Sequence, residues 1–300
     1  MKVLVIGGTY FLGRVFVLQS YKDFDLTLVN RGNYSMASLG VKEYHFDRHD
    51  ILSWEQLPNE SYDAVVDFCA YQAGDIEKVM KHFQGQIKQY ILVSTVDVYK
   101  RQTGLYKDEK HSLETRHFEG EVGEYIFQKV QLEKELQTIS QKYDIPYTII
   151  RPGNIYGPFN YAPRESEFIK YIVNGLPLIK PSDADALFQL VYVKDVAIGI
   201  IKCIQQKAYY KIYNIISNEC IHYEDVYQCL INCSEKSVHM IDHTIEEIIQ
   251  MGYSLPYPLN KEEEELYNGQ LICQELGLTY TSLQEGMEKT YQAFLPIYQQ

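Results

Sequence analysis

The chain has 300 residues, of which 46% are hydrophobic and 23% charged, so one large α/β domain or a nucleotide-binding domain with a smaller lobe is expected. Its formal net charge of −12 argues against a general nucleic-acid binder, because an acidic surface repels phosphates. The sequence contains neither a CxxC pair nor histidines at metal-ligand spacing, and no apolar run approaches a membrane span of about 18 residues. A cytoplasmic protein without a metal site is therefore expected.

Short apolar runs and amphipathic stretches alternate along the first half of the chain. We predict strands at 3–6, 26–29, 64–68, 90–93 and 147–150, and helices at 11–20, 75–82 and 125–143. Strands separated by helices form parallel sheets, and all-apolar strands suit a sheet covered on both sides. The pattern predicts an α/β protein with a doubly wound parallel (Rossmann) sheet.

Prolines interrupt this alternation after residue 151. A strand at 187–193, a helix at 196–205 and a strand at 213–216 are expected beyond them. We therefore predict a nucleotide-binding domain from 1–154 and 186–212. A smaller, mostly helical substrate lobe is expected from 155–185 and 213–300.

A glycine-rich segment separates the first strand from the first helix. Gly7 would allow a tight turn there, and Gly13 would let the helix pack closely on the strand. The free N–H groups of the helix would then face a pyrophosphate. Tyr10 stands where a third glycine is usual, so its ring must point away from the cofactor or cover it. The NAD(P)-binding residues expected in this turn are Gly7, Thr9, Tyr10, Phe11, Leu12 and Gly13.

The second strand ends at Asn30 and Arg31, where NAD-specific sites usually carry an acid for the ribose hydroxyl. Asn30 is neutral, and Arg31 could pair with a 2′-phosphate. These residues predict a preference for NADP over NAD.

Tyr125 and Lys129 are four residues apart on a predicted helix and so share one face. An ammonium near a phenol is expected to lower the phenol pKa and suit it to proton transfer. Ser94 and Thr95 follow a buried strand, at the sheet edge where open α/β folds place their chemistry. These four residues are the predicted catalytic group.

Together these motifs resemble the extended short-chain dehydrogenase/reductases, of the NAD-dependent epimerase/dehydratase group. Further segments carry the resemblance: 49–51 is similar to an adenine-contacting acid, 66–70 to a strand end beside the cofactor, 151–158 to an RPxxxYGP segment, and 190–197 to an HVxDVA segment. The cofactor contacts that it implies are Asp50, Ile51, Cys69, Ala70, Lys129, Pro152, Asn154 and Ile155.

The resemblance implies that Tyr125 takes a proton from a substrate hydroxyl while the nicotinamide accepts hydride. Lys129 would bind the nicotinamide ribose, and Thr95 would hold the reacting oxygen. An epimerase would return the hydride to the other face of the keto intermediate, whereas a reductase would release its product after one transfer. Dehydratases of this type carry Thr-Asp-Glu near Ser94, but Val96 here cannot exchange a proton, so we disfavour elimination.

Three cations in the second lobe could meet a nucleotide diphosphate, which favours a sugar nucleotide as substrate: Arg164, Lys170 and Lys180. The expected substrate-binding residues are Asp97, Arg164, Phe168 and Tyr192. The glycine turn also resembles the chloroplast stem-loop RNA-binding proteins of this superfamily, and a cofactor sensor without turnover is a third reading. The net charge argues against RNA, and the intact Tyr-Lys pair argues against a sensor. The resemblance also suggests a homodimer.

Overall fold

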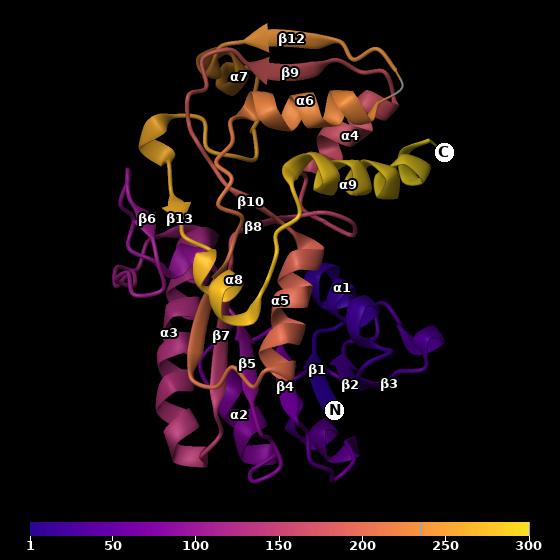
Figure 1. Ribbon diagram of the computed structural model, residues 1–300, viewed down its shortest axis with the longest axis vertical. Helices are drawn as coiled ribbons and strands as arrows, with labels where there is room; N and C mark the ends of the chain where they lie inside the picture. Colours follow the sequence, from indigo (N-terminus) through magenta and orange to yellow (C-terminus); the bar gives the residue numbers. More distant parts are fainter. Residues whose placement is uncertain (235, 300) are drawn as a thin grey trace.

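The computed structural model describes residues 1–234 and 236–299, and a seven-stranded sheet forms its largest unit. The strands are β1 (Lys2–Ile6), β2 (Asp25–Asn30), β3 (Lys42–His45), β4 (Ala64–Asp67), β5 (Tyr90–Val93), β7 (Tyr147–Pro152) and β11 (Lys211–Ile215). All neighbours pair in parallel, in the spatial order β11-β7-β5-β4-β1-β2-β3 (Figure 1). The chain order reverses between β1 and β4, and a switch point of this kind opens a crevice outside the carboxyl ends of the strands.

Helices cover both faces of this sheet. α1 (Phe11–Ser20) and α5 (Val193–Gln205) pack together on one face, and α2 (Asp75–His82) packs with α3 (Gly120–Tyr143) on the other (Figure 1). Successive residues of β1 point to opposite faces, so Val3 and Val5 join the core under α1 and α5. Leu4 joins the core under α2 and α3. The prediction of a doubly wound α/β fold is confirmed.

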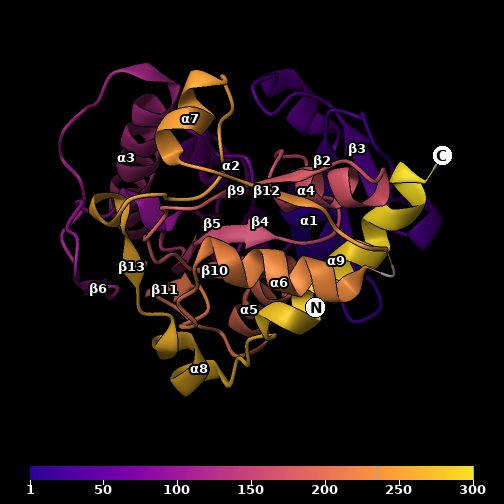
Figure 2. The same cartoon turned by 90° about the horizontal axis from the view of Figure 1, so that it is seen from above.

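The remaining elements build a second lobe above the carboxyl ends of the strands (Figure 1). Its elements are α4 (Glu165–Val173), β9 (Leu178–Pro181), α6 (Tyr223–Cys233), β12 (Met240–His243), α7 (Ile245–Gln250) and α9 (Leu283–Tyr298). α9 packs against α4 and α6, and Figure 2 shows α6 and α9 side by side. Parallel pairs join β12 to β9, β10 (Leu190–Tyr192) to β8 (Asn154–Tyr156), and β13 (Leu266–Tyr267) to β6 (Tyr106–Lys107). α8 (Gln270–Leu276) packs on β11.

Several element bounds differ from those expected. α3 begins at Gly120, five residues before the predicted start, so Tyr125 lies in its second turn rather than at its end. β3 was not predicted, and the large sheet includes β11 through Ile215, beyond the expected domain boundary at 212. The division of the chain into two domains stays a prediction.

Within residues 1–234 and 236–299, no helix combines the length and apolarity that crossing a bilayer requires. The six cysteines are free thiols. The same residues form no cluster of three or more side chains suited to holding a metal ion.

Candidate active site

The glycine turn that joins β1 to α1 is tightly packed. Gly7 has φ of +88°, a conformation that glycine adopts without strain, and its N–H donates to Val29 O at 2.9 Å. A Cβ on Gly13 would press against the carbonyl oxygen of Gly7. Both glycines are therefore required by the close approach of helix and strand, as the sequence indicates. Tyr10 has extended backbone (φ −126°) just before α1, and its side chain is 49% exposed.

A cavity of about 790 Å³ lies between this turn, the ends of the strands and residues 152–164. Ligand sites in proteins have volumes of about 300–1,000 Å³, so a dinucleotide and part of a substrate fit its size. Most predicted site residues line it: Gly7, Thr9, Tyr10, Phe11, Leu12, Gly13, Asn30, Arg31, Cys69, Ser94, Thr95, Asp97, Tyr125, Lys129, Pro152, Asn154, Ile155 and Arg164.

Four predicted residues lie outside this lining. Asp50 is exposed at the start of a 3-10 helix, where its carboxylate accepts a hydrogen bond from Ser53 (2.7 Å). Phe168 packs on Tyr227 with ring centroids 5.2 Å apart. Tyr192 is buried against Tyr156. Ala70 is buried and contributes its carbonyl to the site, as described below. The side chain of Ile51 lies outside the described part of the structure.

Asp47, Arg48 and His49 line the cavity where the sequence suggested Asp50 and Ile51. The adenine-contacting acid was assigned three residues too far along the chain, because two acids, Asp47 and Asp50, occur in the same short segment. The chain direction after β3 decides between them, since Asp47 lies two residues after the strand end and Asp50 is the residue before the next helix.

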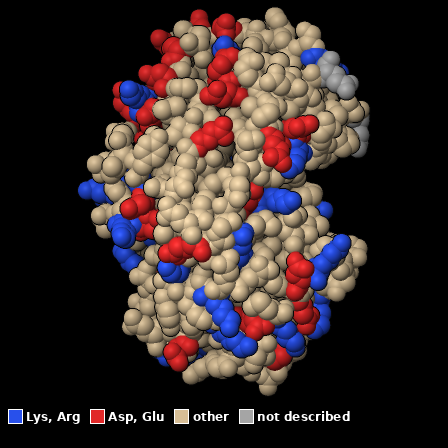
Figure 3. Space-filling model, in the orientation of Figure 1, with Lys and Arg blue, Asp and Glu red and all other residues tan. Residues whose placement is uncertain are grey.

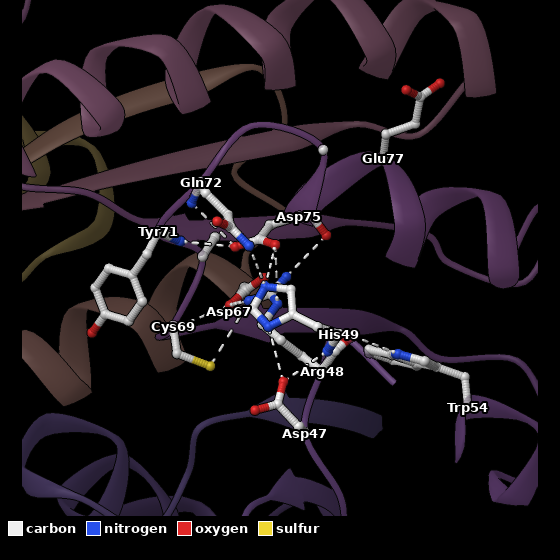
Figure 4. A network of polar contacts seen from close by, with 12 residues as sticks. Asp47, Arg48, His49, Trp54, Asp67, Cys69, Tyr71, Gln72, Asp75 and Glu77 are labelled. Carbon is white, nitrogen blue, oxygen red and sulfur yellow. Dashed lines mark hydrogen bonds and ion pairs between the residues drawn. The ribbon is translucent and has the colours of Figure 1, made fainter. Parts of the chain in front are cut away.

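Arg48 is the centre of a buried polar network beneath this part of the cavity (Figure 4). Its Nη1 donates to Asp67 Oδ1 at 2.8 Å, and its Nη2 donates to Asp75 O at 2.9 Å. Asp67, at the end of β4, also accepts from Tyr90 OH (2.5 Å) and from the N–H of Cys69 (3.0 Å). The network ties the loop after β3 to the end of β4.

His49 connects this network to the cavity, which it lines. Its two ring nitrogens contact the carboxylates of Asp47 (2.9 Å) and Asp75 (3.0 Å), and Gln72 lies 2.8 Å from Nε2 (Figure 4). Burial and the neighbouring Asp67 raise the pKa of the Cys69 thiol to about 12, so Cys69 lines the cavity as a neutral, unreactive group.

Lys129 reaches the floor of the cavity from α3. Its Nζ donates to Ala70 O at 2.9 Å and to Val93 O at 3.0 Å, and the residue is 3% exposed. The ammonium lies 4.8 Å from the ring centroid of Tyr71 and 5.7 Å from that of Tyr125. Burial lowers the pKa of Lys129 to about 8. Tyr71 was not predicted from the sequence because no motif marks it. The end of β4 places its ring beside the Lys129 ammonium.

The expected effect of Lys129 on the Tyr125 pKa was wrong for this arrangement. Burial around the hydroxyl raises the pKa of Tyr125 above its ordinary value, and the charge of Asp97 raises it further. Lys129 directs its ammonium hydrogens to two carbonyl oxygens instead of to the phenol. Tyr125 is therefore neutral at physiological pH.

The hydroxyls after β5 differ in how they are bonded. Thr95 donates to Asp97 Oδ2 at 2.8 Å and accepts from the Asp97 N–H at 3.2 Å. Ser94 is 3% exposed, and its Oγ has no hydrogen-bond partner among the residues that the structure describes. Ser94 is consequently the hydroxyl that is free to bond a ligand.

Two cations that the sequence placed near a substrate diphosphate are paired elsewhere. Lys170 lies 3.3 Å from Glu167, and Lys180 lies 2.6 Å from Glu224. Arg164 does line the cavity, with Nη2 donating to Ile155 O at 3.1 Å. Arg151 of the RPxxxYGP segment forms a buried ion pair with Glu133, which fixes α3 to β7.

A parallel sheet in this strand order, with a glycine turn at its switch point, defines a dinucleotide-binding fold of the Rossmann type. Residues 76–215 match the model of the NAD dependent epimerase/dehydratase family.

Curated relatives include two different activities. The chain is 28% identical over 245 residues to the chloroplast stem-loop binding protein of 41 kDa b from Arabidopsis thaliana, covering 74% of this chain and 60% of the relative. It is 24% identical over 271 residues to dTDP-D-glucose 4,6-dehydratase from Dictyostelium discoideum, covering 78% and 62%. The chain thus spans about three fifths of the length of both relatives.

Solved structures with the same fold include the UDP-glucose 4-epimerase of Thermus thermophilus in complex with NAD. The TM-score is 0.75 with 18% sequence identity, over 98% of this chain and 99% of that one.

Proposed function

We propose that this chain transfers hydride between a nicotinamide dinucleotide and a hydroxyl or keto group of a sugar nucleotide, with Tyr125 as the proton-transfer residue. One observation carries the proposal: Tyr125, Lys129 and Ser94 line the same cavity as the glycine turn. The matched family is NAD-dependent, and the glycine turn supports a dinucleotide because it lines this cavity directly before the N-terminus of α1.

When bound, the nicotinamide supplies the hydride acceptor and donor. The chain's own groups handle the proton. Tyr125, with its raised pKa, delivers a proton to a carbonyl oxygen and takes it back in the reverse direction. Ser94 donates a hydrogen bond to the same oxygen, and Lys129 holds the nicotinamide ribose with a buried ammonium.

An epimerase or a reductase fits these residues better than a dehydratase does. Elimination of water needs an acid next to Thr95, and this position is Val96, which is 3% exposed and carries no ionisable group. Thr95 already bonds Asp97, so the only acid of this segment is tied to a neighbouring hydroxyl.

Arg164 is the cation that we assign to the substrate diphosphate. It lines the cavity, and its Nε is buried without a partner among the described residues. A guanidinium with free donors is suited to bidentate bonding with phosphate oxygens.

We also propose the preference for NADP that Asn30 and Arg31 predict. The Oδ1 of Asn30 accepts from the Gly32 N–H at 2.7 Å, while its buried Nδ2 has no partner in the described chain and so awaits an acceptor. Arg31 lines the same part of the cavity. Calorimetry with NADPH and NADH tests this preference: tighter NADPH binding that Arg31→Ala abolishes is expected, and tighter NADH binding would refute it.

The Tyr125→Phe variant tests the proposed reaction. Loss of the phenol oxygen should lower kcat by about 10²–10⁴-fold with a UDP-sugar substrate, while cofactor affinity stays within about twofold. Tyr143→Phe, the same substitution in the last turn of α3, is the matched control and should leave kcat unchanged. Full turnover in Tyr125→Phe would overturn the assignment.

RNA binding is the second candidate, favoured by the similarity to the stem-loop binding protein. On the face in Figure 3, basic side chains are interspersed with acidic ones, and acidic side chains gather over the top of the second lobe. Binding of a structured RNA in a filter assay at low salt would favour this candidate, whereas turnover of a sugar nucleotide favours the first.

A homodimer, a cytoplasmic location and the two-domain division stay proposals. Sedimentation at micromolar concentration tests the first, and a mass of one chain would refute it. Fractionation of cells tests the second. Expression of residues 1–154 joined to 186–212 tests whether the predicted nucleotide-binding domain folds alone.

A further inference from the structure

Three tyrosine rings from separate segments meet at the mouth of the cavity. Tyr10 comes from the glycine turn, Tyr34 from the loop after β2, and Tyr161 from the segment between β8 and α4. The ring centroid of Tyr10 lies 5.6 Å from that of Tyr34 and 4.9 Å from that of Tyr161. All three line the cavity, so the rings span its opening from the sheet to the second lobe.

The Tyr10 ring contacts both of the other rings, although all three residues lie at the surface. Tyr161 is 67% exposed, and Tyr10 and Tyr34 are each 49% exposed. Isolated exposed aromatics are ordinary, but here one ring contacts two others that line the same cavity, and exposed apolar groups gathered in this way often mark a binding surface. Tyr161 also meets Phe11 edge-on at 6.1 Å, so the ring from the second lobe rests on the first residue of α1.

Tyr161 also lines the same cavity as Tyr71 and Tyr125. One residue of the second lobe thus contacts the glycine turn and shares the cavity with the proposed proton donor.

We propose that Tyr10, Tyr34 and Tyr161 form a tyrosine clasp that keeps the dinucleotide in the cavity from one turnover to the next. This inference rests on the proposed function. The helix N-terminus that would hold a pyrophosphate begins directly after Tyr10, so the clasp lies over the part of the cavity that would take the pyrophosphate. Aromatic contact closes this opening without placing a negative charge beside the phosphates.

The clasp bears on the choice between the two reactions. In an epimerisation the hydride taken from the substrate carbon returns to that same carbon, so the dinucleotide ends each cycle in its starting redox state and need not leave. A reductase must exchange its oxidised cofactor after every hydride transfer. A cofactor retained by the clasp therefore favours epimerisation.

Release of NADH from the full chain, and of NADPH in parallel, tests the clasp. Bound reduced dinucleotide is displaced by excess oxidised dinucleotide in a stopped-flow instrument, and its fluorescence is followed. Tyr161→Ala should release it roughly tenfold faster, because one aromatic pair contributes about 0.5–1.5 kcal/mol and tenfold corresponds to about 1.4 kcal/mol. Tyr161→Phe keeps the ring and should retain the slow rate.

Two further variants separate the clasp from a general effect on the protein. Tyr253→Ala removes a ring that is also 49% exposed but does not line the cavity, and should release at the wild-type rate. Tyr10→Ala/Tyr161→Ala should release little faster than Tyr10→Ala, because the two rings act as one contact. Release from Tyr161→Ala at the wild-type rate would overturn the clasp alone. A wild-type chain that binds neither dinucleotide would overturn the clasp and the proposed function together.

Discussion

Charged groups are buried at two walls of the cavity, and the two walls differ in whether these groups have hydrogen-bond partners. Beneath Cys69, the carboxylate of Asp67 accepts hydrogen bonds from Arg48, Tyr90 and the Cys69 N–H. Beside α4, the Nε of Arg164, one carboxylate oxygen of Glu165 and the hydroxyl of Tyr257 are buried without a partner in the described residues.

Buried polar groups in folded proteins nearly always have partners, supplied by the chain, by ordered water or by a ligand. The wall at Asp67 is therefore complete in the chain alone, whereas the wall at Arg164 has bonding capacity left for a substrate. Under the proposed function, the difference teaches that the wall at Asp67 is organised in advance and that the wall at Arg164 is completed on binding.

The largest effect on stability is expected when the wall at Asp67 loses the charge of Arg48. Arg48→Met would leave Asp67 buried with an unpaired carboxylate, which costs about 3–5 kcal/mol of the free energy of unfolding. Urea denaturation measures this change. Arg48→Met/Asp67→Asn removes both charges and should recover a large part of the loss. A cost below about 1 kcal/mol in the single variant would show that this wall does not depend on the ion pair.

The next largest effect is expected at the glycine turn. In Gly13→Ala the new methyl group presses on the Gly7 carbonyl, so α1 must move away from β1, at about 1–3 kcal/mol. Affinity for NADH, measured by calorimetry, should fall along with the melting temperature. Gln19→Ala, near the other end of α1, is the control and should leave both values close to wild type.

Much of the fold followed from the sequence. Strands with apolar residues on both faces and helices between them were predictable because a sheet covered on both sides leaves that pattern. β3 was not predicted from the sequence because Lys42-Glu43-Tyr44-His45 carries the polar residues of a strand at the sheet edge. The second lobe was predicted only as mostly helical, since the parallel pairing of β9 with β12 joins segments about 60 residues apart.

The candidate site was predictable where a motif fixes the backbone. Gly7, Gly13, Tyr125 and Lys129 belong to such motifs and reach one cavity. Tyr71, Arg48 and the contacts of the Lys129 ammonium were not predictable, because they depend on where separate strand ends meet. The direction of the Tyr125 pKa shift was missed for the same reason: burial and Asp97 outweigh a cation that is bonded elsewhere.

A smaller effect, confined to substrate, is expected at the incomplete wall. Arg164→Gln should raise KM for a UDP-sugar roughly tenfold, because a hydrogen bond to a charged group is worth about 1.5–3 kcal/mol, and should leave the free energy of unfolding nearly unchanged. Lys170→Gln removes a cation of α4 that is paired with Glu167 away from the cavity, and should keep the wild-type KM. Equal KM values in both variants would remove Arg164 from the substrate site.

The smallest effect is a pH dependence from Glu165. Burial raises the pKa of this carboxyl above its usual 4.5, so the folded chain holds the proton to higher pH than the unfolded chain does. The contribution of Glu165 to stability therefore falls as pH rises from the unfolded pKa through the folded pKa. Glu165→Gln should gain stability relative to wild type as pH rises above about 4.5 in urea titrations. A difference that stays constant above this pH would show that Glu165 does not titrate there.

The central claim is that the dinucleotide lies along the glycine turn with its nicotinamide beside Tyr125. A crystal structure of the chain with NAD or NADP tests it most directly. The account predicts the pyrophosphate at the start of α1 and the nicotinamide within contact of the Tyr125 hydroxyl. A dinucleotide bound elsewhere, or bound in the cavity with its nicotinamide turned away from Tyr125, would contradict it.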